Sequence, residues 1–248
     1  MLYLWNLIFA QPIFNLLIFL YNVVPGHDIG LAIILLTVLI KAVLWPLSGQ
    51  ALRSQKALAE LQPKMDALKK EYGDKQEELA KAMMALYSKE KVSPFSSCLP
   101  LLIQLPVFIA LYHALGQGLK SSGYEALYPF VKNPGTITPM LFGMIDIAKR
   151  SIPLAIAAAA AQYLQAKMMI TRQQPKKTPG AKDEEMLAVM NKQMLYMMPA
   201  MTLFIGWKLP GGLALYWLMQ NVLTVGQQWW YFHRGVKKAD MTVTAVIK

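Results

Sequence analysis

A lysine lies inside the first long apolar run of this sequence and limits the folds that the chain can adopt. Residues 30–46 are otherwise almost entirely apolar, with Lys41 in the second half of the run. A charge within a helix of membrane-spanning length is costly and is usually functional. On a helix, Thr37, Lys41 and Ser48 project within about 40° of one another. This polar stripe is therefore expected to face something other than lipid.

Two arrangements could accommodate Lys41. Its ammonium group could reach the cytoplasmic interface, which lies about seven residues or roughly 10 Å further along the helix. Alternatively, Lys41 could line a wet cavity inside a helix bundle. Because a lysine side chain covers only part of the first distance, the cavity is the preferred interpretation.

The composition is that of a polytopic membrane protein. Of the 248 residues, 55% are hydrophobic and only 16% are charged, and several apolar runs are long enough to span a bilayer. The net charge of +11 does not indicate DNA binding, because the basic residues gather between the apolar runs. Membrane topology and anionic lipids account for basic residues in such places.

Chemistry at a metal or a cofactor is not predicted. Cys98 is the only cysteine, which excludes a disulfide framework and a cysteine metal cluster. The sequence contains no metalloprotease, hydrolase or phosphate-binding motif, so we expect a protein without an active site. The N-terminus lacks the features of a secretory signal or a transit peptide, which makes a prokaryotic plasma membrane the default location.

The alternation of apolar and basic runs divides the chain into ten segments of an all-α, polytopic fold. Five of them are predicted to be transmembrane helices around a hydrophilic groove. The expected segments are an outer interfacial helix and turn (1–28), the first transmembrane helix (29–49), a cytoplasmic helical hairpin (50–94), the second transmembrane helix (95–117), an extracytoplasmic loop (118–151), the third transmembrane helix (152–170), a cytoplasmic loop (171–193), the fourth (194–207) and fifth (212–231) transmembrane helices, and a basic cytoplasmic tail (232–248).

The first 24 residues allow two interpretations. Pro12 interrupts the apolar run, and Gln11, Asn15 and Asn22 project from one side of a helix. A polar side on an otherwise apolar helix is typical of a helix that lies in the membrane interface. A spanning helix is the alternative, since the length would permit it.

The segment after the first span has the pattern of an antiparallel helical hairpin. Gly73 and Asp74 form a turn signal, and apolar residues repeat at steps of three and four on both sides of it. These residues are Leu58, Leu61, Met65, Leu68 and Tyr72 before the turn, and Leu79, Met83 and Leu86 after it.

Lysine and arginine residues set the orientation. Nine lie in 53–91, five in 172–192 and four after His233, whereas five lie on the opposite side, Lys208 included. Cytoplasmic segments carry the excess of basic residues. The hairpin and the C-terminus are therefore expected in the cytoplasm, with the N-terminus outside.

Polar side chains within the predicted spans share one depth. Lys41 lies past the midpoint of the first span, and the inner halves or middles of the others hold Gln104, Gln162, Gln165, Gln220 and Asn221. An interhelical hydrogen bond is the simplest explanation for any single glutamine. The shared depth, however, indicates a cleft that opens to the cytoplasm and is closed outside. Such a cleft does not suit a channel, but it suits a transient acceptor of acidic or hydrophilic chain segments.

Four motifs resemble those of the YidC/Oxa-type membrane protein insertases. They are Leu-Gln-Pro-Lys at 61–64, Met-Ala-Leu-Tyr-Ser-Lys-Glu-Lys-Val-Ser-Pro at 84–94, Cys-Leu-Pro-Leu-Leu-Ile-Gln-Leu-Pro-Val-Phe-Ile-Ala-Leu-Tyr at 98–112, and Gly-Leu-Ala-Leu-Tyr-Trp-Leu-Met-Gln-Asn at 212–221. The similarity extends from about residue 10 to residue 233. In this combination and order the motifs are specific to the family.

The resemblance implies a five-span core, a cytoplasmic hairpin, an outer interfacial helix and a groove with one basic residue. Lys41 matches the position where the family typically has arginine, with Thr37 one turn before it and Trp217 at the matching position of the fifth span. Lysine lacks the planar fork of arginine and can lose its proton when buried. The resemblance also implies that the substrates are nascent membrane proteins and that the protein inserts them into the lipid bilayer. It would do so alone or together with the Sec translocon and translating ribosomes.

Our leading hypothesis is therefore an insertase. The cytoplasmic surface of the hairpin would receive a nascent hydrophobic segment through Leu61, Met65, Met83 and Met84, and the groove would hold its polar flank. One alternative is an anion carrier with Lys41 as its substrate site, which usually has repeated halves that this sequence lacks. A passive scaffold for membrane assembly is the other alternative.

Overall fold

The described part of the chain is mostly helical. The computed structural model describes residues 2–73, 75–92, 99–118, 123–171 and 193–233, and it confirms the all-α class. The longer elements are α2 (Gln11–Val23), α3 (Ile29–Val43), α4 (Trp45–Tyr72), α5 (Gln76–Lys89), α6 (Leu99–Gly118), α7 (Ile152–Thr171), α9 (Met198–Lys208) and α10 (Gly211–His233). The short elements are α1 (Leu2–Trp5), the π-helices η1 (Asn6–Ala10) and η5 (Gln193–Met197), the 3₁₀ turns η2 (Pro25–His27) and η4 (Tyr124–Ala126), and the strands β1 (Met140–Leu141) and β2 (Ile145–Asp146).

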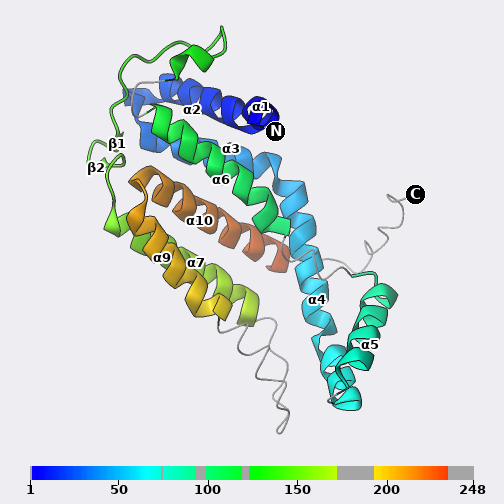
Figure 1. Ribbon diagram of the computed structural model, residues 1–248. Coiled ribbons are helices and arrows are strands. Elements are labelled where there is room, and N and C mark those ends of the chain that lie inside the picture. Colours follow the sequence, from blue (N-terminus) through cyan, green and yellow to red (C-terminus); the bar gives the residue numbers. More distant parts are fainter. Residues whose placement is uncertain (1, 74, 93–98, 119–122, 172–192, 234–248) are drawn as a thin grey trace.

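Helix α10 lies at the centre of a bundle. It lies between α3 and α6 on one side and α7 and α9 on the other (Figure 1). Its first turn packs closely, because a Cβ atom on Gly212 would lie 3.1 Å from Leu115 and 3.2 Å from Ile33. Leu213 is completely buried in the same apolar core. Helix α2 covers α3 and α6 from the outside.

Length and apolarity identify few of these helices as membrane spans. Within the described residues, Asn6–Val23 is long and apolar enough to cross a membrane, and the bent pair Ile29–Val43 and Trp45–Ser54 would add a second span if it is counted as one. The number of five spans therefore stays a prediction. The choice between an interfacial and a spanning position for the first 24 residues also stays open.

The segment expected as one continuous first span is broken. Helix α3 ends at Val43 and α4 begins at Trp45, and the two are bent by 63°. Pro46 lies in the first turn of α4, where the missing backbone N–H leaves no hydrogen bond unmade. The second helix of this pair therefore continues directly into the predicted cytoplasmic hairpin.

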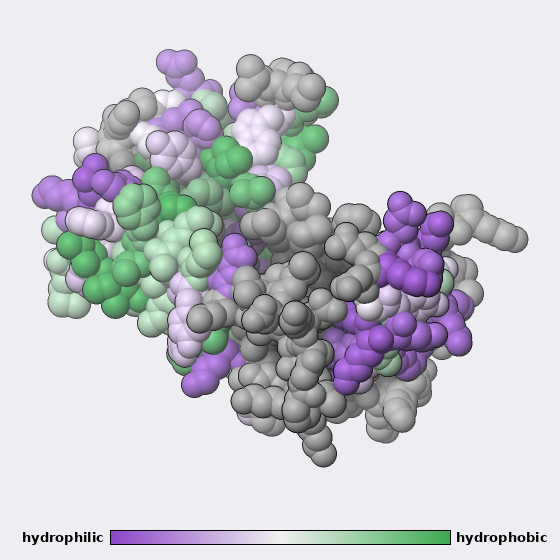
Figure 2. Space-filling view, turned by 60° about the horizontal axis from the view of Figure 1, so that its bottom comes forward, coloured by the Kyte–Doolittle hydropathy of each residue, from purple (hydrophilic) through white to green (hydrophobic). Residues whose placement is uncertain are grey.

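The two helices of that hairpin, α4 and α5, extend away from the bundle (Figure 1). Gly73 has a φ of 53° in the connection between them, a conformation that glycine adopts without strain. Met65 is buried between the helices and accepts a hydrogen bond at Sδ from the Tyr87 hydroxyl, at 3.5 Å. Lys64 of α4 forms an ion pair with Glu90, the residue directly after α5. On the face shown in Figure 2, hydrophilic residues cover this hairpin and hydrophobic residues dominate the bundle.

The polar side of α2 binds a loop of the protein. Asn15 is buried, accepts a hydrogen bond at Oδ1 from the Tyr128 backbone N–H at 2.6 Å, and donates to the Ala126 carbonyl at 3.0 Å. Gln11 donates to the same carbonyl and Asn22 donates to that of Lys132. The polar pattern that favoured an interfacial helix is thus explained by contacts within the protein, so it does not by itself indicate a position in the interface.

A short β-hairpin interrupts the predicted loop. Met140 pairs with Asp146 and Leu141 with Ile145 in an antiparallel register, which the sequence analysis did not anticipate. In the turn between the strands, Phe142 has a φ of 52° and Gly143 a φ of 67°. The left-handed conformation costs a non-glycine residue roughly 1–2 kcal/mol. We call the end of the bundle that carries this β-hairpin the loop end.

Candidate functional site

Lys41 is buried in the bundle and is bound by α10. Its side chain is 6% exposed, and its Nζ donates to the Thr224 hydroxyl oxygen at 2.9 Å. The Thr224 hydroxyl donates in turn to the Gln220 carbonyl at 2.7 Å. Because the Thr224 hydroxyl proton is donated within α10, a lone pair of the hydroxyl oxygen is available to accept from the Lys41 ammonium group. The ammonium group is therefore directed into the bundle, where α10 supplies its hydrogen-bond acceptor.

The polar network continues from α10 to α6. Gln220 Nε2 donates to Gln104 Oε1 at 2.8 Å, and Gln104 Nε2 donates to the Tyr216 hydroxyl. These bonds connect three helices from Lys41 to Tyr216 through side chains and one backbone carbonyl. A chain of this kind holds each member in one orientation, since neighbouring bonds polarise one another at low dielectric.

Thr37 lies one turn before Lys41 on the same side of α3, as the helical spacing predicts. It is buried, and its hydroxyl donates to the Ile33 carbonyl at 2.7 Å. Trp217 is half-buried on α10, with its ring centroid 5.4 Å from that of Phe108 on α6. Trp217 therefore joins α10 to α6 through an aromatic contact next to the polar network.

A second set of polar contacts joins α7 to its neighbours. The Thr202 hydroxyl of α9 donates to Gln162 Oε1, and Asn221 Nδ2 of α10 donates to the Ala158 carbonyl at 3.2 Å. Gln165 is half-buried and lies two turns after Ala158, on the same face of α7. The structure thus places Gln162 and Asn221 in separate interhelical hydrogen bonds, apart from the network of Lys41.

The residues predicted to receive substrate on the hairpin divide into two kinds. Leu61 and Met65 are buried, because the spacing of three and four that identified them places them on the apolar side of α4 that faces α5. Met83 is half-buried, and Met84 is 62% exposed. Of the four, Met84 offers the most surface to a substrate.

The bend after Lys41 is held by the far end of α10. Gln227 Nε2 donates to the Trp45 carbonyl at 3.3 Å, and the rings of Trp45 and Tyr231 lie 6.4 Å apart. The Arg53 guanidinium lies 5.9 Å from the centroid of the Tyr231 ring, a cation–π distance. Helix α10 therefore contacts both Lys41 and the bend that follows it.

Sequence reasoning noted several polar residues along α10 but did not select the one that binds Lys41. Thr224 follows Gln220 by four residues, so both lie on one side of the helix. That spacing was the available signal. Within the described ranges, no group of three or more histidine, cysteine, aspartate or glutamate side chains could hold a metal ion.

A bundle of apolar helices with a buried lysine and an internal polar network is consistent with a helical membrane protein. Comparison with known proteins gives its family. The model of the 60Kd inner membrane protein family matches residues 19–238, and the chain belongs to this family. The resemblance inferred from the four motifs is thereby confirmed.

Similar proteins named membrane protein insertase YidC occur in several bacteria. The protein from Pelobacter propionicus is 34% identical over 226 residues, which cover 90% of this chain and 38% of the relative. The protein from Laribacter hongkongensis is 36% identical over 230 residues, which cover 92% of this chain and 36% of the relative. This chain therefore spans about two fifths of the length of the curated relatives that it matches.

Proposed function

We propose that this chain is a membrane protein insertase that takes nascent hydrophobic segments from the cytoplasm and releases them into the bilayer. The names of its relatives support this function. The observation that carries the proposal is the buried Lys41, held by Thr224 in a network that joins three helices. A cation at this depth is costly, and its retention fits a role in binding acidic or polar chain segments.

The proposed membrane arrangement has five spans, formed by α3, α6, α7, η5 with α9, and α10. Consecutive spans alternate in direction along the bundle (Figure 1), as membrane crossings require. The distribution of basic residues favours an orientation with the loop end outside and the α4–α5 hairpin in the cytoplasm. Lys41 then lies in the inner half of its span, where an acidic flank that enters from the cytoplasm can reach it.

The mechanism follows from charge and burial. A substrate segment would first meet the exposed part of the hairpin, which includes Met84. Its polar flank would then exchange water for Lys41 and the glutamine side chains of the network, while its apolar part moves sideways into lipid. The charge attraction is stronger here than at a surface lysine, because the effective dielectric is lower. The Sec translocon and translating ribosomes are proposed partners, and no cofactor is required.

Reconstitution tests this function. Purified protein in liposomes is expected to insert a small substrate with an acidic flank, which is measured as a protease-protected fragment. Protein-free liposomes serve as the control. A yield no higher than in the protein-free liposomes would reject the insertase. The same vesicles should show no flux of a labelled anion, because the loop end of the bundle is filled by an apolar core that includes Ile33, Leu115 and Leu213; measurable flux would favour the carrier.

A further inference from the structure

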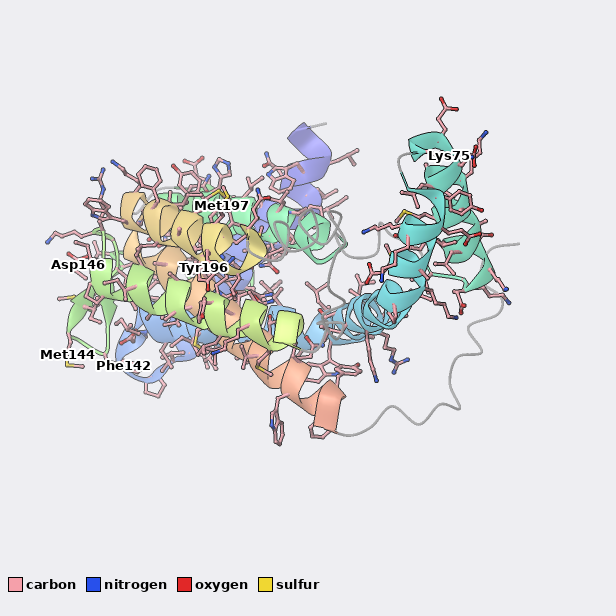
Figure 3. All side chains as sticks on the ribbon, turned by 90° about the horizontal axis from the view of Figure 1, so that it is seen from below. Lys75, Phe142, Met144, Asp146, Tyr196 and Met197 are labelled. Atoms are coloured by element: carbon pink, nitrogen blue, oxygen red, sulfur yellow. The ribbon has the colours of Figure 1, made fainter. Side chains whose placement is uncertain are left out.

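The β-hairpin at the loop end presents two large apolar side chains to the outside. Phe142 is 59% exposed and Met144 is 79% exposed. Both lie at the end of the bundle opposite Lys75 and the α4–α5 hairpin (Figure 3). Met144 was not singled out by the sequence, and the proposed function uses neither residue.

The turn itself does not favour a phenylalanine. The Met144 N–H donates to the Leu141 carbonyl at 3.0 Å, and the two residues between them have positive φ. This is a type I′ turn, which favours asparagine, aspartate or glycine at both central positions. A bulky residue with positive φ is unusual. Phe142 is therefore strained where the preferred residues would not be.

The protein core does not explain Phe142 either. The neighbouring residues Leu141 and Ile147 are buried and supply the apolar contacts of this region to the core. Phe142 thus adds strain without filling the interior. Strain of this kind that persists in a structure points to a use outside the packing of the fold.

Hydrogen bonds hold the turn at a defined position relative to the ends of α3 and α10. Asp28 caps α3 by accepting from the Leu31 N–H at 2.9 Å, and its other oxygen accepts from the Phe142 N–H. On the far side of the β-hairpin, the Gly212 N–H at the start of α10 donates to the Ile147 carbonyl at 2.9 Å. The turn is thus tied to the first residues of two predicted spans, which places it at the depth where these helices leave the membrane.

The charges around the turn suit a lipid surface. Asp146 is the acidic residue of the β-hairpin, and Lys149 binds it at 2.9 Å, a hydrogen bond that lowers the pKa of the Asp146 carboxyl. Arg150 follows, and Lys208 lies at the same end, 5.7 Å from the ring centroid of the exposed Trp207. Aromatic and basic side chains together are typical of the membrane interface.

We propose that the turn Leu141–Met144 inserts Phe142 and Met144 into the outer interface of the lipid bilayer and thereby fixes the depth of the bundle. The inference rests on the proposed membrane arrangement, with the loop end outside. Lipid is the partner, because the exposed apolar turn is bonded to the first residues of two proposed spans and is accompanied by basic residues that match anionic headgroups.

Spin labels test this position. Met144→Cys in a Cys98→Ser background carries the spin label, and the full chain is reconstituted in vesicles of phosphatidylcholine and phosphatidylglycerol. The measurement is the collision rate of the label with oxygen, which enters lipid, and with a polar nickel chelate, which does not. Lys132→Cys, exposed in the same loop, is the water reference, and Ile156→Cys, exposed on α7, is the lipid reference. The label at 144 should resemble the one at 156.

Each outcome decides the inference. A label at 144 that collides with nickel as freely as one at 132, while the label at 156 stays in lipid, overturns the lipid contact and leaves the five-span arrangement intact. Nickel access at 156 would overturn the arrangement itself, and the inference with it.

A second variant separates lipid contact from folding. Phe142→Asn suits the turn better and removes the apolar side chain. It should raise nickel access at 144 by roughly threefold without lowering the unfolding temperature in detergent. Unchanged nickel access in this variant would show that Phe142 does not hold the turn in lipid.

Discussion

Replacement of Lys41 by glutamate is expected to lower the insertion of a substrate with an acidic flank by about tenfold or more. At an effective dielectric of about 20, unit charges about 4 Å apart interact by roughly 4 kcal/mol. A reversed charge turns this attraction into repulsion, and about 1.4 kcal/mol already corresponds to a factor of ten. The measurement is the yield of protease-protected substrate in liposomes.

Matched variants show whether the charge of Lys41 is responsible. Lys41→Arg should keep most of the insertion, and Lys81→Glu, a reversal on the exposed side of α5, should have little effect. Thr224→Val removes the hydrogen-bond acceptor of Lys41 and should cause a smaller loss than Lys41→Glu. A substrate with a basic flank should recover insertion by Lys41→Glu, which a misfolded variant could not do. Wild-type insertion of the acidic substrate by Lys41→Glu would contradict the role of the charge.

Replacement of Asn15 by leucine is expected to destabilise the fold by about 2–4 kcal/mol. The buried Asn15 side chain makes three hydrogen bonds, to Gln11, Ala126 and Tyr128. Each such bond contributes about 0.5–1.5 kcal/mol, and a buried partner left unpaired adds its own cost. In thermal unfolding in detergent, this loss should lower the midpoint by roughly 5–15 °C.

Asn22→Leu is the matched control. Asn22 makes a single hydrogen bond, to the Lys132 carbonyl, and that bond is more exposed than those of Asn15. This replacement should lower the midpoint by less than a third as much as Asn15→Leu. Equal midpoints for the two variants would show that the Asn15 contacts do not hold the loop to α2.

The sequence predicted the site best where all the residues concerned lie on one helix. Lys41 stood out because it interrupts an aliphatic run, and the helical spacing placed Thr37 beside it. Four motifs then identified the family. The break at Leu44 was missed, because Pro46 near the end of a helix permits either a continuous or a broken span.

Contacts between distant parts of the chain were the main features that the sequence failed to predict. Thr224 is separated from Lys41 by 183 residues, and spacing along α10 alone does not show which of its polar residues meets α3. Asn15 shows the same limit. Its position in a polar stripe favoured the membrane interface, but two of its three partners are backbone groups of a loop more than one hundred residues away, so the stripe alone does not distinguish a lipid interface from a contact within the protein.

The β-hairpin turn was missed for a local reason. Leu-Phe-Gly-Met at 141–144 lacks the Asn-Gly or Asp-Gly signal that predicts a type I′ turn. Because the first central position holds a phenylalanine instead, the sequence does not predict the turn. Once the backbone is known, this unusual phenylalanine points to a use outside the fold.

Photo-crosslinking of a stalled nascent chain tests the central claim most directly, because it asks whether a substrate enters the bundle. The crosslinking residue is placed at Gln165, on the face of α7 that contacts α10, and at the neighbouring Leu164, which is 55% exposed on α7. An insertase with a groove at Lys41 should capture the nascent chain from 165 and much less from 164. No adduct from 165, or equal adducts from both positions, would contradict a substrate path through the bundle.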